Sequence, residues 1–125
     1  MVVIDTSVLI DHIRQKGKNS IFDEFIKKTQ DVFAISLVSV QELYEGKSTK
    51  DVQIGHEILN LINSLEVIPY TFENAKLAGE IARDLDHPID LADAAIAAAA
   101  ILNKARLLTL NKKHFQDIKE LKLIK

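Results

Sequence analysis

The chain has 125 residues, 47% of them hydrophobic and 27% charged, a composition that indicates one globular domain and excludes disordered and fibrous classes. It contains no cysteine, which excludes disulfide frameworks and thiolate metal sites. The formal net charge of −2 excludes the general attraction to nucleic acids of a strongly basic protein, so a polyanion would have to be bound by local cations or metal ions.

Hydrophobic periodicity divides the chain into strands and helices. In chain order, the expected elements are strand 2–4, helix 6–15, helix 20–29, strand 32–36, helices 39–46 and 51–63, strand 66–69, helices 72–85 and 90–104, strand 106–110 and an edge strand 121–124. Nearly all-apolar strands separated by helices indicate a parallel sheet covered on both faces. The sequence therefore predicts a single α/β domain over residues 1–125, with a three-layer α/β/α architecture and a central parallel sheet of four to five strands.

Polar residues follow the first expected strand at once. Asp5 stands where this strand ends, and Thr6 stands where the next helix begins. Open α/β sheets bind their ligands at the carboxyl ends of the strands, so both residues are candidates for a functional site. The structural alternative is that one of them is the N-cap of the helix.

Two later helices carry acids near their first turns. Glu42 lies in the helix expected at 39–46, and Asp93 lies one turn inside the helix that Asp90 begins. Ser39 and Glu42 also have the spacing of a capping box, and acids in a first turn are favoured by the helix dipole whatever their function. The alanines after Asp93 would let this helix pack closely against the sheet, which would also fix the carboxylate in position.

The strand expected at 106–110 has polar residues at its carboxyl end. Thr109 and Asn111 stand there, followed by Lys112 and Lys113. The two lysines are candidates for contacts with a phosphate backbone, and His114 beside them could contact phosphate as well. The alternative is an ordinary solvated loop.

Three of these carboxylates can meet at one edge of the sheet. Strand ends and the following helix starts share that edge, which places Asp5, Glu42 and Asp93 near one another. Negative charges brought together repel one another unless a cation or a proton lies among them. Carboxylate and amide oxygens favour a hard divalent ion, Mg²⁺ or Mn²⁺, which would also bind substrate phosphates.

The motifs around these residues resemble the PIN domain, and within it the VapC-type toxin ribonucleases. A hydrophobic strand followed by D-T-S comes first, then S-x-x-E-L-Y-x-G, D-x-x-I-A-A and L-x-T-x-N-x-x-x-F, nearly from end to end of the chain. The resemblance implies a metal-dependent endoribonuclease that hydrolyses single-stranded RNA by water attack, as the toxin of a type II toxin–antitoxin pair. It also implies one or two Mg²⁺ or Mn²⁺ ions, an antitoxin partner and a homodimer.

The resemblance assigns roles to particular residues. The implied metal ligands and catalytic acids are Asp5, Glu42 and Asp93. The implied substrate-positioning residues are Thr6, Thr109, Lys112 and Lys113. Asn111 is a further metal ligand that stands where many relatives have a fourth acid, and its neutral amide leaves open whether a second ion binds. Asp90 and Asp117 are reserve acids that could compensate.

Other interpretations of the sequence stay open. An inactive RNA-binding or interaction module of the same fold is the main alternative, because Asn111 is not an acid. A phosphoacceptor receiver domain would need an aspartate after the strand at 32–36, and none follows. Nucleotide-binding folds are disfavoured because neither glycine-rich phosphate motif occurs.

The first two helices contain more apolar residues than one buried face requires. These residues are Val8, Leu9, Ile13, Phe22, Phe25 and Ile26. Part of this stripe is predicted to form a groove for an antitoxin tail, and the alternative is a wide stripe that faces the core. No apolar run approaches the roughly 20 residues of a membrane span, and no secretory signal is recognisable, so the expected location is cytoplasmic.

Overall fold

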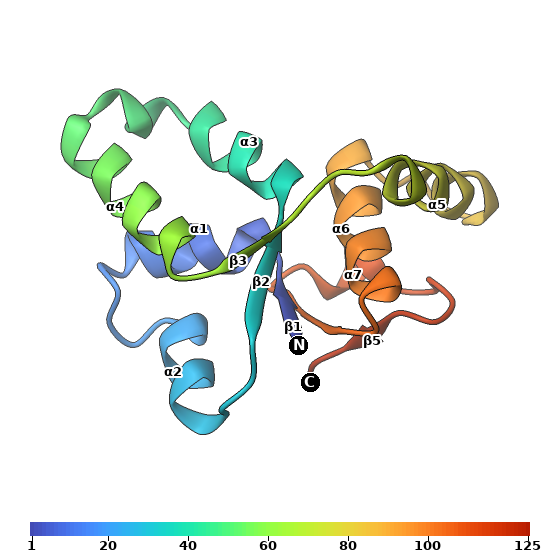
Figure 1. Ribbon diagram of the computed structural model, residues 1–125, viewed down its shortest axis with the longest axis horizontal. Helices are drawn as coiled ribbons and strands as arrows, with labels where there is room; N and C mark the ends of the chain where they lie inside the picture. The colour runs from blue at the N-terminus through green and yellow to red at the C-terminus, as the bar shows by residue number, and fades with distance from the viewer.

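A five-stranded parallel sheet forms the centre of the computed structural model, which describes residues 1–125 (Figure 1). The strand order is β3-β2-β1-β4-β5, so the first strand lies in the middle of the sheet. In chain order the strands are β1 (Val2–Ile4), β2 (Phe33–Ser36), β3 (Glu66–Ile68), β4 (Arg106–Leu108) and β5 (Lys122–Leu123). The predicted parallel sheet is therefore confirmed, with the edge strand as its fifth member.

Helices cover both faces of the sheet and produce three layers (Figure 1). One layer consists of α1 (Thr6–Arg14), α2 (Ile21–Lys28), α3 (Leu37–Glu45) and α4 (Val52–Asn63). The other layer consists of α5 (Phe72–Asp84), α6 (Leu91–Leu102) and the short α7 (Lys112–Phe115). A 3₁₀ turn, η1 (Lys47–Lys50), connects α3 to α4. The predicted three-layer α/β/α architecture is thus confirmed.

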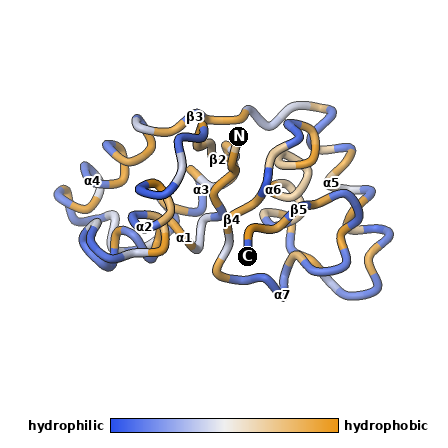
Figure 2. The backbone as a smooth tube through the Cα atoms, turned by 90° about the horizontal axis from the view of Figure 1, so that it is seen from below, coloured by the Kyte–Doolittle hydropathy of each residue, from blue (hydrophilic) through white to orange (hydrophobic).

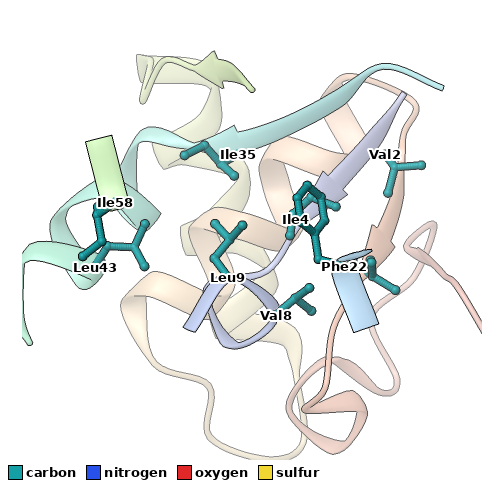
Figure 3. Packing of buried hydrophobic residues seen from close by; sticks show 9 residues of the cluster. Val2, Ile4, Val8, Leu9, Phe22, Ile35, Leu43 and Ile58 are labelled. Atoms are coloured by element: carbon teal, nitrogen blue, oxygen red, sulfur yellow. The ribbon is translucent and has the colours of Figure 1, made fainter. Parts of the chain in front are cut away.

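The central strand β1 is buried on both faces, as a parallel sheet requires. Val2 and Ile4 point into the core beneath α1, α2 and α4, whereas Val3 points into the core beneath α6. Figure 3 shows the first of these cores, in which Phe22 of α2 packs beside the strand residues. Burying each such side chain contributes about 1.5–3 kcal/mol to folding. The sheet is thereby fixed between its two helical layers.

The apolar residues of the first two helices serve mainly this core. Val8, Leu9 and Phe22 are buried in it, and Ile13 and Phe25 pack against it while remaining partly exposed. Since only part of the stripe was predicted to form a partner groove, that prediction is now restricted to Ile13, Phe25 and Ile26. The physical reason is that a helix lying on a sheet buries a wide apolar stripe.

The alanine-rich α6 lies directly against the sheet. Its residues 94–100 are all buried, and the helix contacts β1, β2, β4 and α5. The predicted close packing of α6 is confirmed, because alanine side chains keep the helix axis near the strands. Figure 2 shows hydrophobic residues along the central strands and hydrophilic ones on the outer loops. Among the helices, none has both the length and the apolar character that a membrane-spanning helix needs.

Element boundaries differ from the sequence predictions at a few places. Helix α3 begins at Leu37, two residues before the expected start, and β4 ends at Leu108. The turns η1 and α7 were not predicted, since each covers only four residues and so shows no periodicity. The segment that begins at Lys112 is therefore a short helix and not an extended loop.

The strand order reverses between β1 and β4. From β1 the chain leads to β2 and β3 on one side, and β4 then pairs with the other side of β1. In open α/β sheets, ligands bind outside the carboxyl ends of the strands at such a reversal. Asp5 follows β1 and Thr109 follows β4, so the topology places both residues at this point.

Candidate functional site

Asp5 is a buried carboxylate at the carboxyl end of β1, with 3% of its surface exposed. It is the N-cap residue of α1, but its side chain does not cap the helix. Instead, Asp5 Oδ2 accepts hydrogen bonds from Ser7 Oγ and from Thr109 Oγ1, each at 2.7 Å. The carboxylate therefore binds hydroxyl side chains of α1 and of the chain that leaves β4, rather than the backbone amides of its own helix.

The same two hydroxyls bind the chain that leaves β4. Thr109 Oγ1 accepts a hydrogen bond from the Asn111 amide at 2.9 Å, and Ser7 Oγ accepts one from the Leu110 amide at 3.2 Å. Each hydroxyl thus accepts a hydrogen bond from a backbone amide and donates one to Asp5. Thr109 was predicted as a positioning residue, whereas Ser7 was not singled out, although it completes the D-T-S motif.

Thr6 connects α1 to the acid on α3. Thr6 Oγ1 lies 2.6 Å from Glu42 Oε1 and 2.9 Å from Ser39 Oγ, and both Thr6 and Ser39 are buried. A hydroxyl has one proton, so Thr6 donates to the carboxylate and accepts from Ser39. Glu42 is therefore held by a residue distant in the sequence.

The capping-box interpretation of Ser39 and Glu42 is wrong. The N-cap of α3 is Ser36, whose side chain accepts a hydrogen bond from the Val38 amide at 3.2 Å. Because the helix begins two residues earlier than expected, Ser39 lies inside it and cannot act as its cap. Glu42 therefore lies beyond the first turn of α3, and its carboxylate accepts a hydrogen bond from Thr6.

The pKa of Glu42 is raised above its ordinary value. Burial is the main cause, the hydrogen bond from Thr6 partly opposes it, and the charges of Asp5 and Asp90 add to the increase. These contributions show that carboxylates from β1, α3 and the start of α6 influence one another. The site therefore has an excess of negative charge.

Asp93 is the most perturbed acid of the chain. Its pKa is raised to about 7 by burial, then by a hydrogen bond and repulsion from Asp90 and by repulsion from Asp5, while the charge of His114 lowers it. His114 Nδ1 lies 3.1 Å from Asp93 Oδ2. The sequence did not predict this contact, because the two residues are 21 positions apart and meet only through the fold.

The raised pKa of Asp93 predicts a pH dependence of stability. A carboxyl whose pKa is higher in the folded than in the unfolded chain stabilises the fold while protonated, and this contribution is lost as the pH rises through the folded pKa. The metal-free protein should therefore lose melting temperature between about pH 4 and pH 7, since the ordinary value is 3.8 and the folded value is about 7. Asp93→Asn should flatten the profile in this range, as measured by circular dichroism melts. An unchanged profile in that variant would contradict the assignment.

The remaining predicted residues have different positions. Asn111 is exposed and is the N-cap residue of α7, and no hydrogen bond involves its side chain. Lys112 and Lys113 are exposed on α7 beside the site. Asp90 lies next to Asp93, whereas Asp117 lines a separate pocket with residues of α5. Of the two reserve acids, only Asp90 therefore lies close to Asp93, and Asp117 does not.

A second histidine, His87, lies near Asp90 and Asp93. The sequence did not assign it to the site. Its Nδ1 faces the Pro88 carbonyl and its Nε2 faces the Gln116 carbonyl, each at 3.2 Å. These two carbonyls raise the pKa of His87, because only the doubly protonated ring can donate to both. A cationic ring is thus favoured in the pocket that contains Asp90 and Asp93.

The donor set has the chemistry of a site for a hard divalent cation. It consists of carboxylate oxygens from Asp5, Glu42, Asp90 and Asp93, and repulsion from Asp5 and Asp90 contributes to the raised pKa of both Glu42 and Asp93. No three Asp, Glu or His side chains are arranged so that they could hold a metal ion. Glu42 and Asp93 each bind a protein partner instead, namely Thr6 and His114. The residue types therefore fit Mg²⁺ or Mn²⁺, whereas their arrangement in this structure does not form a metal site.

Comparisons with known proteins identify relatives over almost the whole chain. The family model described as the PIN domain matches residues 2–121. Ribonuclease VapC10 of Mycobacterium tuberculosis is 35% identical over 126 residues, which cover 98% of this chain and 91% of the relative. Ribonuclease VapC1 of Methanocaldococcus jannaschii is 32% identical over 123 residues, with 95% and 82% covered. The crystal structure of DNA-bound VapBC from Salmonella typhimurium contains a chain with a TM-score of 0.85 and 26% identity, with 98% and 96% covered.

Proposed function

This chain belongs to the PIN domain family, and we propose that it is a divalent-metal-dependent endoribonuclease acting as the toxin of a toxin–antitoxin pair. The family predicted from the sequence motifs is thus confirmed. The ribonuclease activity is supported by the names of the two relatives that are more than 30% identical. The toxin role is supported by the VapBC complex to which the fold is similar.

The observation that carries this proposal is that acids from separate elements lie close enough at the strand reversal for the charge of Asp5 to raise the pKa of two others. Asp5 raises the pKa values of both Glu42 and Asp93, although the three residues come from three different elements. Maintaining such repulsion is unfavourable for folding and is expected where a cation relieves it. A purely structural role for these acids would not require their proximity.

The proposal assigns a task to each group. Asp5, Glu42 and Asp93 would hold one Mg²⁺ or Mn²⁺, with Asp90 as a further acid and Asn111 as a neutral ligand. When bound, the ion would lower the pKa of a water molecule and neutralise charge on the phosphate. Thr6 and Thr109 keep the Glu42 and Asp5 carboxylates in position through their hydroxyls. Lys112 and Lys113 would bind the phosphate backbone of the substrate.

The proposed partners are RNA, an antitoxin protein and a second copy of the chain. Single-stranded RNA is the proposed substrate class because its bases and backbone are accessible to protein side chains. The antitoxin would inhibit the nuclease by covering the acids. An apolar segment of it would pack against the partly exposed side chains of Ile13 and Phe25. We expect the complex to be cytoplasmic and the toxin to be a homodimer.

Incubation of the purified chain with a mixed-sequence single-stranded RNA tests the activity. We expect internal cleavage with Mn²⁺ or Mg²⁺ and no cleavage with a chelator, as followed by denaturing gel electrophoresis. Cleavage that persists in excess chelator would contradict the metal dependence. RNA that stays intact with either ion, together with measurable binding, would favour the second candidate below.

A second candidate is an RNA-binding module of the same fold without nuclease activity. The observation that favours it is the absence of any group of three acids or histidines arranged to hold a metal ion. The exposed, neutral Asn111 also favours it. The two candidates differ in whether Glu42 is required for the cleavage of RNA.

A further inference from the structure

A cationic cavity opens at the carboxyl end of β4. It has a volume of about 470 Å³, within the range of ligand pockets. Its lining includes Thr109, Leu110, Lys112, Lys113 and His114. No aspartate or glutamate side chain lines this β4-exit pocket, although the chain as a whole has a net charge of −2. The pocket is therefore a local concentration of positive charge in an acidic protein.

The β4-exit pocket adjoins the acids through shared residues. Thr109 lines it and donates a hydrogen bond to Asp5 Oδ2 at 2.7 Å. Lys113 and His114 line it and also line the second pocket, of about 300 Å³, that contains Asp90 and Asp93. Helix α7, which Figure 2 shows as a hydrophilic segment, thus contributes to both cavities. A single extended ligand could occupy both.

The wall of the β4-exit pocket combines two kinds of contact. Lys112 and Lys113 provide ammonium groups, and Ile21, Leu110 and Ile124 provide an apolar surface. A nucleotide needs both, because its phosphate is an anion and its base has apolar faces. An acidic peptide would use the lysines but would not explain why residues of this cavity also line the pocket of Asp90 and Asp93.

We propose that the β4-exit pocket binds the nucleotide next to the bond that is cleaved. The phosphate of this nucleotide contacts Lys112 and Lys113, and its base packs on Leu110, Ile21 and Ile124. This inference rests on the proposed ribonuclease function and adds the determinants of substrate binding to it. The pocket then supplies the attraction for RNA that the net charge does not.

Binding of a short fluorescein-labelled single-stranded RNA, measured by anisotropy in chelator, tests the proposal without any cleavage. The double variant Lys112→Gln, Lys113→Gln should bind roughly tenfold more weakly, and its plot of log affinity against log salt should be shallower by about 1.4, because each lost phosphate contact removes about 0.7. Leu110→Ser should weaken binding with an unchanged salt slope, since it removes a contact to the base and no charge.

Lys28→Gln is the matched control, because Lys28 is exposed at the end of α2 and lines neither pocket. It should bind RNA like the wild type. Wild-type affinity and salt slope in the double lysine variant would overturn the proposal. If the double variant binds weakly while the wild-type chain never cleaves RNA with Mn²⁺, the pocket inference stands and the nuclease assignment fails.

Discussion

Glu42→Gln should abolish RNA cleavage and leave the fold intact. The substitution removes one negative charge but keeps an amide oxygen that can accept the hydrogen bond which Thr6 now donates at 2.6 Å. Any structural role of Glu42 is thereby preserved, and only its capacity to bind a cation or to act on water is lost. We expect a fall in the cleavage rate of about 10²–10⁴-fold, the usual contribution of a positioned acid–base group. The measurement is the rate of RNA cleavage with Mn²⁺, with circular dichroism as the check on folding.

Glu45→Gln is the matched control for this experiment. Glu45 lies on the same helix, is exposed and accepts a hydrogen bond from Gln41, so its change alters the charge of α3 equally without altering the Thr6 contact. The Glu45→Gln variant should cleave RNA at the wild-type rate. Equal cleavage by Glu42→Gln and the wild type would return Glu42 to a structural role and leave the proposed site without its second acid.

The sequence predicted the sheet and the meeting of Asp5 and Thr109 at one of its edges, because these depend on local patterns. The apolar run Val2–Ile4 followed by Asp5 is sufficient to predict a buried strand that ends in a carboxylate. The parallel arrangement followed from the alternation of strands and helices, and it placed Thr109 at the same edge as Asp5. Such inferences need only periodicity and the geometry of parallel sheets.

Other features depend on contacts that no local pattern specifies. Both Ser36 and Ser39 are suitable N-cap residues, and only the packing of α3 decides that Ser36 is the cap. The pairing of Asp93 with His114 depends on where α7 lies against α6. The mutual repulsion of Asp90 and Asp93 is visible in their sequence spacing, but its effect on the pKa of Asp93 needs the burial that the fold provides.

Asp93→Asn should stabilise the metal-free protein and weaken its stabilisation by metal. The negative charge at the start of α6 gains about 0.3–1 kcal/mol from the helix dipole, yet the pKa of Asp93 is raised to about 7, so burial and the neighbouring acids outweigh this gain. At neutral and higher pH the neutral amide should therefore raise the melting temperature without metal.

Mn²⁺ should in turn raise the melting temperature of the wild type, because an ion that binds only the folded state stabilises it by mass action. At an ion concentration of about a hundred times Kd the gain is about 2.7 kcal/mol, or roughly 10 °C for a domain of this size. In Asp93→Asn this increase should be much smaller, since one anionic ligand is lost. Asp86→Asn removes the same charge from an exposed position outside the acid cluster and should keep the full response. A wild-type melting temperature that is indifferent to Mn²⁺ and Mg²⁺ would contradict the metal site, whereas equal responses in both variants would remove Asp93 from it.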